Sequence, residues 1–401
     1  MSLSDNGLVF IFLQLVLLLA LAVFLFDLIC AFWERQARIR IGKFQDRDRW
    51  TRMVLSKGLR WLNATPKVRI SDNTRWVLAD MLKGTFWRRA VQSWQEAALL
   101  LGLNAAYRFS KDPAIYAAIA RFLNSKFNEK GGWKQSPPEV DVAMLAYAVM
   151  SLEGFDARRY KPAFDELLDM IFDRRGDDGT IIYRAHGPDY RFVDTLGLVC
   201  PFLALYGRKF QRPDCVDLAV KQITTFQENG LLQGSRIPFH AYKVSERLPL
   251  GIAGWGRGVA WYGLGLMGVW QHLPEGHAYK QILERDIVEL SKTILSFQNP
   301  NGSWNWTLTR REARADSSAT AFFAWFLRVA AQCEETQGPC DLGSEKAVKY
   351  LMSVTRRTGE IDFSQGDTKD IGVYSQRFDI LPFTQGFAIR CAFYRSTEEE
   401  C

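Results

Sequence analysis

Apolar residues beyond about residue 50 recur mostly at positions i, i+3, i+4 and i+7, which is the spacing of one face of an α-helix. No long alternation of β-branched residues, the pattern typical of a strand, interrupts this spacing. Glycine-bearing turns separate the helices and divide the chain into helical hairpins. The predicted pairs are 90–108 with 113–127, 139–153 with 158–173, 191–207 with 213–228, 257–272 with 277–298, 317–333 with 344–356, and 383–394 with 50–63.

Within each pair, one helix is apolar nearly all round and its partner is amphipathic. Residues 193–206 illustrate the first kind and residues 214–226 the second. A helix without a polar face is buried, whereas a helix with a polar face lies at the surface. We therefore predict an all-α protein in which inner helices are ringed by outer helices, an (α/α)6 toroid. An open solenoid of hairpins is the alternative, but the unusual residues occur at the inner-helix starts rather than along a concave face.

The first 33 residues form a strongly apolar segment. Residues 8–26 are apolar except for Gln14, and the apolar run resumes after Asp27 and continues to Trp33. A helix of about 20 such residues spans the hydrocarbon core of a membrane. The segment lacks the basic start and the small-residue cleavage site of a signal peptide. We therefore predict a retained single-pass anchor at residues 1–33, which contacts the membrane through residues 8–33.

The charges that flank this segment predict its orientation. Lys and Arg are absent before the apolar run, whereas residues 34–49 contain Arg35, Arg38, Arg40, Lys43, Arg47 and Arg49. The flank richer in Lys and Arg stays in the cytoplasm, so the large domain is predicted to be cytoplasmic. Residues 34–84 then form a basic juxtamembrane segment with a first helix, and residues 85–401 form the barrel domain.

The composition narrows the choice of partners and cofactors. The net charge is +7 over 401 residues, and no stretch alternates basic and aromatic residues in the manner of a nucleic-acid site, so we expect no nucleic-acid partner. The seven cysteines are scattered and odd in number, which favours reduced thiols, although Cys333 and Cys340 are near enough in sequence to close a loop. The four His are far apart and no CxxC or HExxH motif occurs, so we expect no metal site.

Polar and aromatic residues recur at the inner-helix starts, at intervals of about 50–65 residues, the length of one hairpin with its loop. In a toroid these starts surround one mouth, so the sequence predicts a ring of functional groups there. The segments are Glu139-Val-Asp141, Phe192-Val-Asp194-Thr195, Trp255-Gly-Arg257-Gly258, Asp316-Ser317-Ser318 and Pro382-Phe-Thr384-Gln385-Gly386.

Asp194 and Asp141 are the candidate catalytic residues. Each opens an inner helix, where Asp also serves as an N-cap that accepts a backbone N–H, and Thr195 can cap in place of Asp194. The two helices are neighbours in the predicted ring. Two carboxylates on neighbouring helices suit acid and base catalysis on a sugar. We expect Asp194 to be the acid, with Asp141 as its partner.

A second group of residues is suited to binding an acidic sugar. Arg offers a planar fork that matches a carboxylate, and Trp offers a flat surface for a sugar ring. Arg257 has Trp255 and Trp261 beside it in sequence, which predicts such a site. Structural roles are the alternative, because an Arg at a helix start and a lone His in a loop are commonly structural. The predicted substrate-binding set is completed by His240, Trp304 and Ser317.

Together these segments resemble the unsaturated glucuronyl and rhamnogalacturonyl hydrolases, which are six-hairpin (α/α)6 glycosidases. The likeness covers about residues 85–395. It rests on Asp141 followed by an apolar helix, Phe192-Val-Asp194-Thr-Leu-Gly with Pro201-Phe-Leu-Ala, Phe239-His-Ala-Tyr, Trp255-Gly-Arg-Gly and Ser317-Ser-Ala-Thr-Ala.

The resemblance implies a hydrolase that uses no metal or cofactor and cleaves oligosaccharides whose terminal uronic acid carries a C4=C5 double bond. The residue matching Asp194 protonates C4 and helps water add at C5, and the resulting hemiketal collapses and expels the leaving sugar. The residue matching Asp141 assists. The positions of His240, Trp255 and Arg257 line the substrate pocket.

The chain departs from the family pattern in three places. Val259-Ala260 stands where the motif usually continues with Asn-Gly, and Asp316 stands where Glu is common. A membrane anchor is atypical for enzymes that digest imported oligosaccharides and suits exopolysaccharide or capsule production better.

We therefore predict a single-pass protein of a bacterial inner membrane that resembles glycoside hydrolases and acts on a uronic-acid-containing oligosaccharide or polysaccharide. Polysaccharide-synthesis proteins are its expected protein partners. One alternative is a non-catalytic component of a polysaccharide-producing complex that binds sugar chains. A sugar epimerase is another alternative, which would require His at the helix starts.

Overall fold

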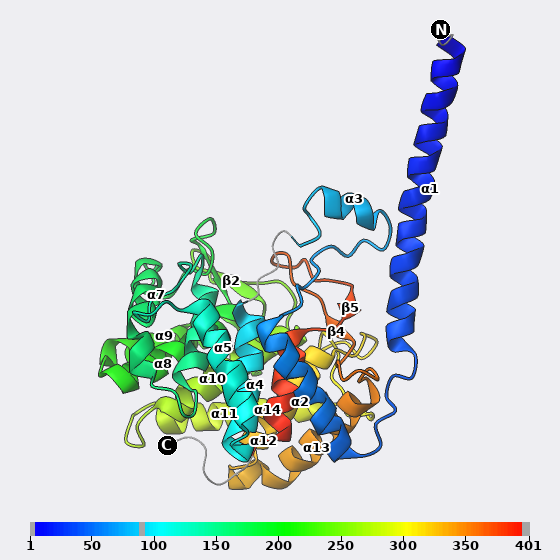
Figure 1. The fold of residues 1–401 in the computed structure, drawn as a ribbon. Coiled ribbons are helices and arrows are strands. Elements are labelled where there is room, and N and C mark those ends of the chain that lie inside the picture. Colours follow the sequence, from blue (N-terminus) through cyan, green and yellow to red (C-terminus); the bar gives the residue numbers. More distant parts are fainter. Residues whose placement is uncertain (1–4, 88–92, 395–401) are drawn as a thin grey trace.

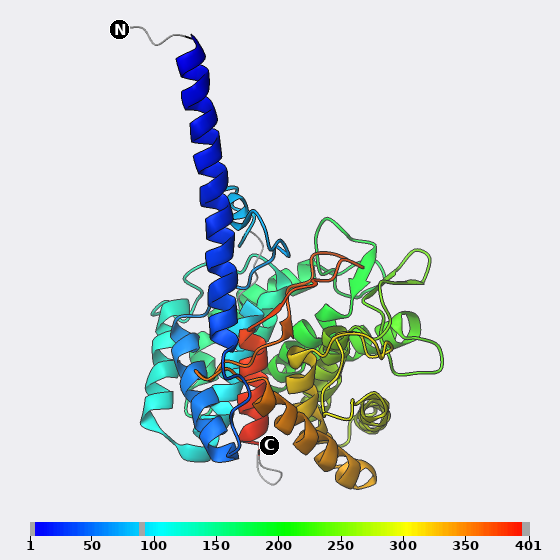
Figure 2. The same cartoon turned by 90° about the vertical axis from the view of Figure 1, so that its right-hand side faces the viewer.

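The computed structural model describes residues 5–87 and 93–394. Helix α1 (Asp5–Arg38) projects from a helical domain as one long helix (Figures 1 and 2). From Gly7 to Arg38 it is long and apolar enough to cross a membrane, and its most apolar window is buried by no other part of the protein described. The predicted apolar helix is therefore confirmed, and its insertion into a membrane stays a prediction.

The inner helices form a closed ring. They are α4 (Ser93–Ser110), α6 (Ala143–Met150), α8 (Asp194–Phe210), α10 (Gly256–His272), α12 (Ser317–Ala330) and α14 (Pro382–Ala392). Each helix contacts the next in this order, and α14 contacts α4. This closure confirms the predicted toroid and excludes the open solenoid.

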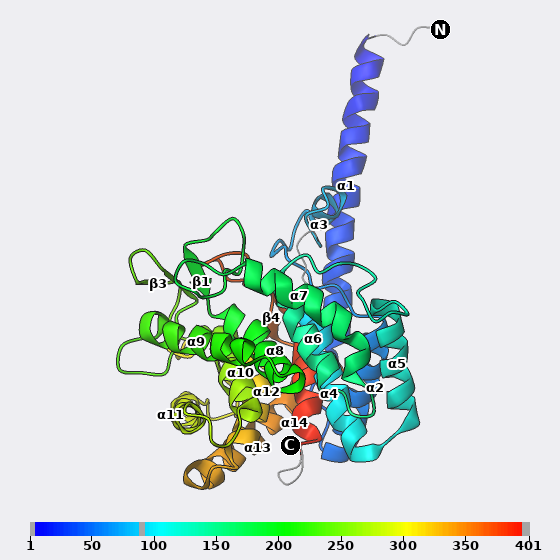
Figure 3. The same ribbon diagram turned by 90° about the vertical axis from the view of Figure 1, so that its left-hand side faces the viewer.

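An outer helix covers each part of this ring (Figure 3). The outer helices are α5 (Pro113–Lys126), α7 (Lys161–Asp173), α9 (Pro213–Gly230), α11 (Lys280–Ser296), α13 (Gln337–Ser353) and α2 (Arg47–Asn63). As predicted, α2 from the start of the domain packs on α14 from its end. The ring therefore includes residues 47–63, which precede the barrel boundary expected at residue 85.

The distribution of apolar residues explains which helices lie inside. Residues 195–207 of α8 are all buried, whereas α9 buries only one stripe. Glycines allow the inner helices to lie very close together. A Cβ on Gly386 would lie 2.1 Å from the carbonyl oxygen of Ala98, and a Cβ on Gly265 would lie 2.8 Å from that of Leu196. Larger residues would therefore separate α14 from α4, and α10 from α8.

The predicted glycine turns join the hairpins. Gly131, Gly179, Gly302 and Gly359 all have positive φ, which residues with a Cβ rarely adopt. At Gly302 a Cβ would also lie 2.2 Å from the carbonyl oxygen of Lys346 in α13. This turn therefore packs directly against the outer helix of the next hairpin.

Short strands at the mouth of the ring differ from the prediction. Residues 191–192, expected in a helix, belong to β1 (Tyr190–Phe192), which pairs with β2 (Ala241–Lys243), and β2 pairs with β3 (Leu248–Leu250). A second pair joins β4 (Ser364–Gln365) to β5 (Phe378–Asp379). Helical periodicity does not reveal pairing between strands, and β1 and β2 are also far apart in the sequence.

Helix bounds also differ from the prediction, and the largest differences are at α6 and α13. Residues 139–153 form a 3₁₀ turn (Val140–Val142) followed by α6, which ends at Met150. Helix α13 begins at Gln337 rather than at residue 344 and ends at Ser353 rather than at residue 356. The first residues of the helix predicted at 90–108 lie outside the described residues. A further short helix, α3 (Val77–Leu82), lies beside α1 (Figure 1).

The base of α1 is bonded to the domain. Arg38 donates from Nε to Oδ2 of Asp362 at 2.9 Å and from Nη2 to the carbonyl oxygen of Phe378 at 2.8 Å. Glu34 of α1 also pairs with Arg377, at 3.1 Å. Burial acts to raise the pKa of Asp362, but the surrounding guanidinium groups hold it below its ordinary value. These ion pairs fix the direction in which α1 leaves the domain.

Every cysteine in the described part of the chain is a free thiol, including Cys333 and Cys340. Burial raises the pKa of the Cys340 and Cys391 thiols, because a thiolate would lose its hydration there. The described cysteines therefore agree with the prediction of reduced thiols.

Candidate active site

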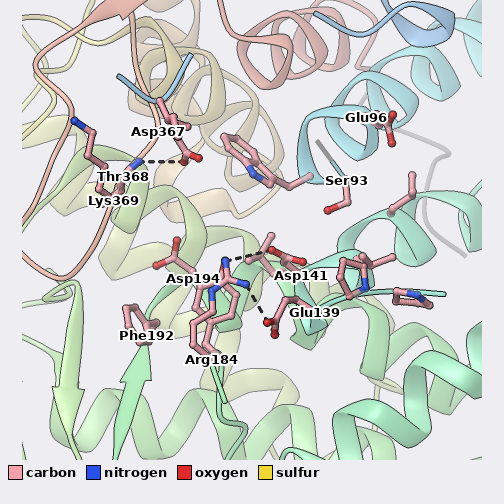
Figure 4. Close-up of a pocket in the computed structure, with 18 of the residues that line it drawn as sticks. Ser93, Glu96, Glu139, Asp141, Arg184, Phe192, Asp194, Asp367, Thr368 and Lys369 are labelled. Atoms are coloured by element: carbon pink, nitrogen blue, oxygen red, sulfur yellow. Dashed lines mark hydrogen bonds and ion pairs between the residues drawn. The ribbon is translucent and has the colours of Figure 1, made fainter. Parts of the chain in front are cut away.

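A pocket of about 1660 Å³ opens where the inner helices start (Figure 4). Its walls come from the starts of α4, α8 and α10, from the 3₁₀ turn before α6, and from residues 70–85 and 367–370. The starts of α4, α6, α8 and α10 therefore meet at one mouth, whereas the predicted starts at residues 316–318 and 382–386 are not among the described residues that line it. The predicted site residues that line the pocket are Asp141, Asp194, His240, Trp255, Arg257 and Trp261.

Asp141 is buried in the wall of the pocket beside a guanidinium group. It lies in the 3₁₀ turn before α6, and 2% of its surface is exposed. Its Oδ2 atom accepts a hydrogen bond from Nη2 of Arg184 at 3.5 Å. Burial raises the pKa of Asp141, Arg184 lowers it in part, and the nearby Glu139 carboxylate adds to the rise. Asp141 therefore holds a proton more readily than an exposed aspartate does.

Asp194 faces the pocket from the first turn of the neighbouring helix. The carboxylates of Asp194 and Asp141 lie on either side of the Arg184 guanidinium (Figure 4). The Asp194 side chain is 15% exposed, and its Oδ2 atom accepts no hydrogen bond from the described residues. The start of α8 has no side-chain cap in this part of the structure. The N-cap alternative therefore does not describe Asp194.

His240 is held next to Asp194 by the unexpected sheet. It directly precedes β2, and its carbonyl oxygen accepts a hydrogen bond from the N–H of Val193 at 2.9 Å. Its Nε2 atom lies 3.5 Å from Oδ2 of Asp194. The imidazole is buried, with its ring centroid 4.8 Å from that of Trp255. His240 therefore adjoins the candidate acid rather than lying in a distant loop.

Arg257 lines the pocket, but its guanidinium anchors a loop. Its Nη1 atom donates to the carbonyl oxygen of Gln365 at 2.8 Å, and Nη2 donates to that of Gly366 at 2.7 Å. Trp255 donates from Nε1 to the Gln365 side chain at 2.9 Å. These bonds hold the loop that carries Asp367 against the mouth. These bonds occupy the Nη1 and Nη2 groups of Arg257, which were expected to bind a sugar carboxylate.

Asp367 is a pocket carboxylate that the sequence analysis did not identify. Protein surrounds it closely, and this burial raises its pKa to about 6, while the Arg257 charge opposes the rise and the Asp194 charge adds to it. Its Oδ1 atom accepts a hydrogen bond from the N–H of Thr368 at 3.0 Å. Asp367 therefore changes its charge near neutral pH within the pocket.

Trp304 and Ser317 are buried and are not among the described residues that line the pocket. Trp304 donates from Nε1 to the carbonyl oxygen of Ile294 at 2.7 Å, so it joins a turn to α11. This corrects the expectation that both residues contact the substrate. The neighbouring Asp316 caps α12, accepting the N–H of Ser318 at 2.8 Å.

Arg184 and Trp94 also line the pocket and were not predicted from the sequence. Arg184 lies in the connection between α7 and β1, where no helical periodicity marks it. Trp94 lies at the start of inner helix α4, a position equivalent to the other helix starts, and the recurrence of those starts was a usable signal. Its ring packs edge-on against that of Trp261, with centroids 5.5 Å apart. The pocket therefore has an aromatic wall and a cation beside its acids.

Solved structures share this fold at low sequence identity. A possible member of glycoside hydrolase family 105 from Salmonella enterica has a TM-score of 0.73 and 18% identity, covering 87% of this chain and 94% of that chain. A possible member of the same family from Klebsiella pneumoniae has a TM-score of 0.71 and 19% identity, covering 86% and 92%. An unsaturated glucuronyl hydrolase from Bacillus sp. GL1, responsible for the degradation of glycosaminoglycan, has a TM-score of 0.63 and 16% identity, covering 86% and 96%. A comparison with curated proteins gave no match.

The sequence itself establishes the family. The family model described as Glycosyl Hydrolase Family 88 matches residues 61–385. This range contains every inner helix except the end of α14, together with all the carboxylates of the pocket discussed above. The protein therefore belongs to glycosyl hydrolase family 88 and is a glycoside hydrolase.

Proposed function

We propose that this protein is a membrane-anchored hydrolase that removes an unsaturated uronic acid residue from the end of an acidic saccharide chain. Asp194 is the general acid and Asp141 assists it. The observation that carries the proposal is the pair of carboxylates at neighbouring inner-helix starts, with Arg184 beside them. The family supports the reaction class, and the fold shared with the unsaturated glucuronyl hydrolase from Bacillus sp. GL1 supports the substrate class.

The proposed reaction begins with a proton transfer from the Asp194 carboxyl group to C4 of the sugar. The electron pair of the C4=C5 bond forms the new C4–H bond, and the ring oxygen stabilises the positive charge that develops at C5. Water adds at C5 and returns a proton to Asp194, so the acid is regenerated. The Asp194 side chain lines the pocket and is partly exposed, and its buried Oδ2 atom is not committed to a protein hydrogen bond, which supports this role.

Collapse of the product of hydration releases the leaving sugar. The bond between C5 and the ring oxygen breaks, leaving a ketone at C5 and a hydroxyl group on C1. The resulting hemiacetal at C1 expels the next sugar as an alcohol and becomes an aldehyde, so one water is consumed overall. Asp141, whose pKa is raised by burial, assists by hydrogen bonding to the bound sugar.

Binding of the acidic sugar is assigned to Arg184 and to the aromatic wall. Arg184 adjoins both carboxylates, and the planar guanidinium matches a carboxylate group. Trp94 and Trp261 are largely buried but line the pocket, so they shape an apolar wall for a pyranose ring. We assign His240 to a hydroxyl group next to the reacting carbons, because it adjoins Asp194.

The apolar helix supports a location at a bacterial inner membrane. The basic residues that follow α1 favour a cytoplasmic domain, by the rule that the flank rich in Lys and Arg stays inside. An anchored hydrolase is suited to chains that are made or handled at the membrane. We therefore propose that it acts in polysaccharide production, alongside the proteins that synthesise the chain.

The test uses the full-length protein in detergent and a panel of unsaturated disaccharides produced by polysaccharide lyases. Hydration removes the double bond, so turnover is measured as loss of ultraviolet absorbance. Asp194→Asn should lower kcat by about 10²- to 10⁴-fold, the usual contribution of a general acid, while calorimetry still detects disaccharide binding.

Asp214→Asn is the matched control, because this exposed carboxylate on α9 pairs only with the neighbouring Arg212 among the described residues. Its turnover should equal that of the wild type. Undiminished turnover in Asp194→Asn would contradict the proposal. Binding of the disaccharides by the wild type without any loss of absorbance would instead favour the non-catalytic alternative.

A further inference from the structure

Residues 70–87, which we call the strap, run between α1 and the mouth of the barrel. The N–H of Ile70 donates to the carbonyl oxygen of Phe86 at 3.2 Å, so the two ends of the strap are joined. Its polar residues Ser71, Asn73, Asp80 and Thr85 are among those that line the pocket. The strap therefore forms part of the rim through which a substrate enters.

Contacts on both sides hold the strap in place. Asp27 of α1 accepts the backbone N–H groups of Trp76 at 2.8 Å and Val77 at 3.0 Å. On the other side, Asp72 accepts hydrogen bonds from Lys369 at 2.8 Å and Ser375 at 2.6 Å, which belong to the loop at the mouth. The strap therefore has one position relative to both the apolar helix and the pocket.

The strap exposes large apolar side chains that no described part of the chain covers. Trp76 is 63% exposed and Leu82 is 80% exposed, and Met81 and Trp87 are exposed beside them. Arg75 and Lys83 next to these residues are also exposed. Apolar and aromatic residues flanked by cations are typical of segments that lie in the headgroup layer of a membrane.

The position of Asp27 along α1 sets the height of the strap. The apolar run 8–26 contains 19 residues by its own numbering and, at about 1.5 Å per residue, it is roughly 28 Å long. This matches the hydrocarbon core, which is about 30 Å thick. With residues 8–26 across the hydrocarbon core, Asp27 and the strap bonded to it would lie where the headgroups begin, and residues 28–33 would lie among the headgroups.

We propose that the strap rests in the lipid headgroup layer as a second membrane contact, with Trp76, Met81 and Leu82 against the lipid. Figures 1 and 2 show that α1 projects from the side of the barrel that carries the strap. The strap is also part of the pocket rim, so this contact turns the pocket toward the membrane surface. The proposal does not depend on catalysis, because none of these three side chains is assigned to the reaction.

The test compares two positions in the full-length protein reconstituted into vesicles of phosphatidylcholine and phosphatidylglycerol. A genetically encoded fluorescent amino acid replaces Leu82 in one variant and Leu342 in the other. Leu342 is a matched exposed leucine on α13, which lies at the end of the domain away from the strap (Figure 1). Circular dichroism verifies that each variant is folded.

Nitroxide-labelled headgroups in the vesicles should quench the fluorophore at position 82 at least about twofold, and should leave the fluorophore at position 342 unchanged. Equal quenching at the two positions would overturn the proposal. Shielding of position 82 from aqueous iodide without quenching by the nitroxide lipid would also overturn it, because the occupant would then be another protein chain. Neither result depends on whether the enzyme turns over a saccharide.

Discussion

The Nη2 atom of Arg184 lies 3.5 Å from Oδ2 of Asp141, and the same guanidinium is near enough to Asp194 to interact with its charge. Burial acts to lower the pKa of Arg184, but the acidic groups around it, Asp141 and Asp194 among them, raise it overall. The guanidinium therefore stays charged between two carboxylates of which one is almost fully buried. An anionic sugar that enters this pocket meets the cation and both candidate catalytic groups together.

Arg184→Gln should raise KM for an unsaturated disaccharide by about 10- to 100-fold, because a charged hydrogen bond contributes about 1.5–3 kcal/mol. Arg184→Lys should recover part of this loss, since the charge remains without the planar fork. Steady-state kinetics measure both effects. Arg174→Gln is the control, because Arg174 pairs with Glu139 at 3.4 Å and is not among the described residues that line the pocket. A KM that Arg184→Gln leaves unchanged would remove Arg184 from the binding site.

Asp367 should make substrate binding depend on pH. Its pKa is raised to about 6, so it is largely neutral at about pH 5 and negative at about pH 7. The uronic acid is negative throughout this range, so KM should rise about fivefold with increasing pH, corresponding to a repulsion on the order of 1 kcal/mol. In Asp367→Asn this rise should disappear. Asp370→Asn, in the same loop but exposed, should keep it. A rise that persists in Asp367→Asn would assign the titration to another group.

Trp304→Phe should affect stability rather than binding. The substitution removes the hydrogen bond to the carbonyl oxygen of Ile294 and leaves a small cavity, so unfolding should become easier by about 1–3 kcal/mol. Denaturant unfolding in detergent measures this change, and KM should equal the wild-type value. Trp261→Phe, in the pocket wall, should instead raise KM. A raised KM in Trp304→Phe would restore the expectation that this residue contacts the substrate.

A lipid-linked saccharide should be a better substrate than the same saccharide free in solution. If the strap turns the pocket toward the bilayer, a substrate held in the same vesicle has a high effective concentration, and kcat/KM should rise at least about tenfold. The comparison uses one unsaturated disaccharide with and without a lipid tail. Replacing Trp76 and Leu82 together by Ser should reduce this advantage without changing the rate on the free disaccharide. Equal rates on both substrates would contradict this prediction, which depends on both proposals.

Much of the fold was predictable because its signals are local. The apolar character of residues 195–207 marks a buried helix, and Gly131 and Gly302 mark turns through their positive φ. The starts of helices were harder to predict. Strands β1 and β2 pair across about 50 residues, so residues expected in the first turn of α8 form a strand. Periodicity reports the neighbours of a residue in sequence and carries no information on such pairing.

Site residues could be predicted where a chemically suitable residue stands at the start of an inner helix. Asp141 and Asp194 line the pocket for this reason. Arg257 also lies at a helix start, but the carbonyl oxygens that engage it belong to residues 365 and 366, more than a hundred positions later. The nearby Val259 and Ala260, where the family motif differs, are buried and are not among the described pocket residues. Distant partners therefore decide which polar groups remain available to a ligand.

The contact between α4 and α14 has a consequence for how the chain folds during synthesis. The ribosome produces α2 and α4 first, but the helix that covers both, α14, comes from residues 382–392. The sides of α2 and α4 that face α14 therefore stay uncovered until residues 382–392 have emerged, while α1 has long been available to the membrane. In an open solenoid, each new hairpin covers the preceding one as soon as it is made. A closed ring completes its core only at the last helix, so we expect one cooperative folding step late in synthesis.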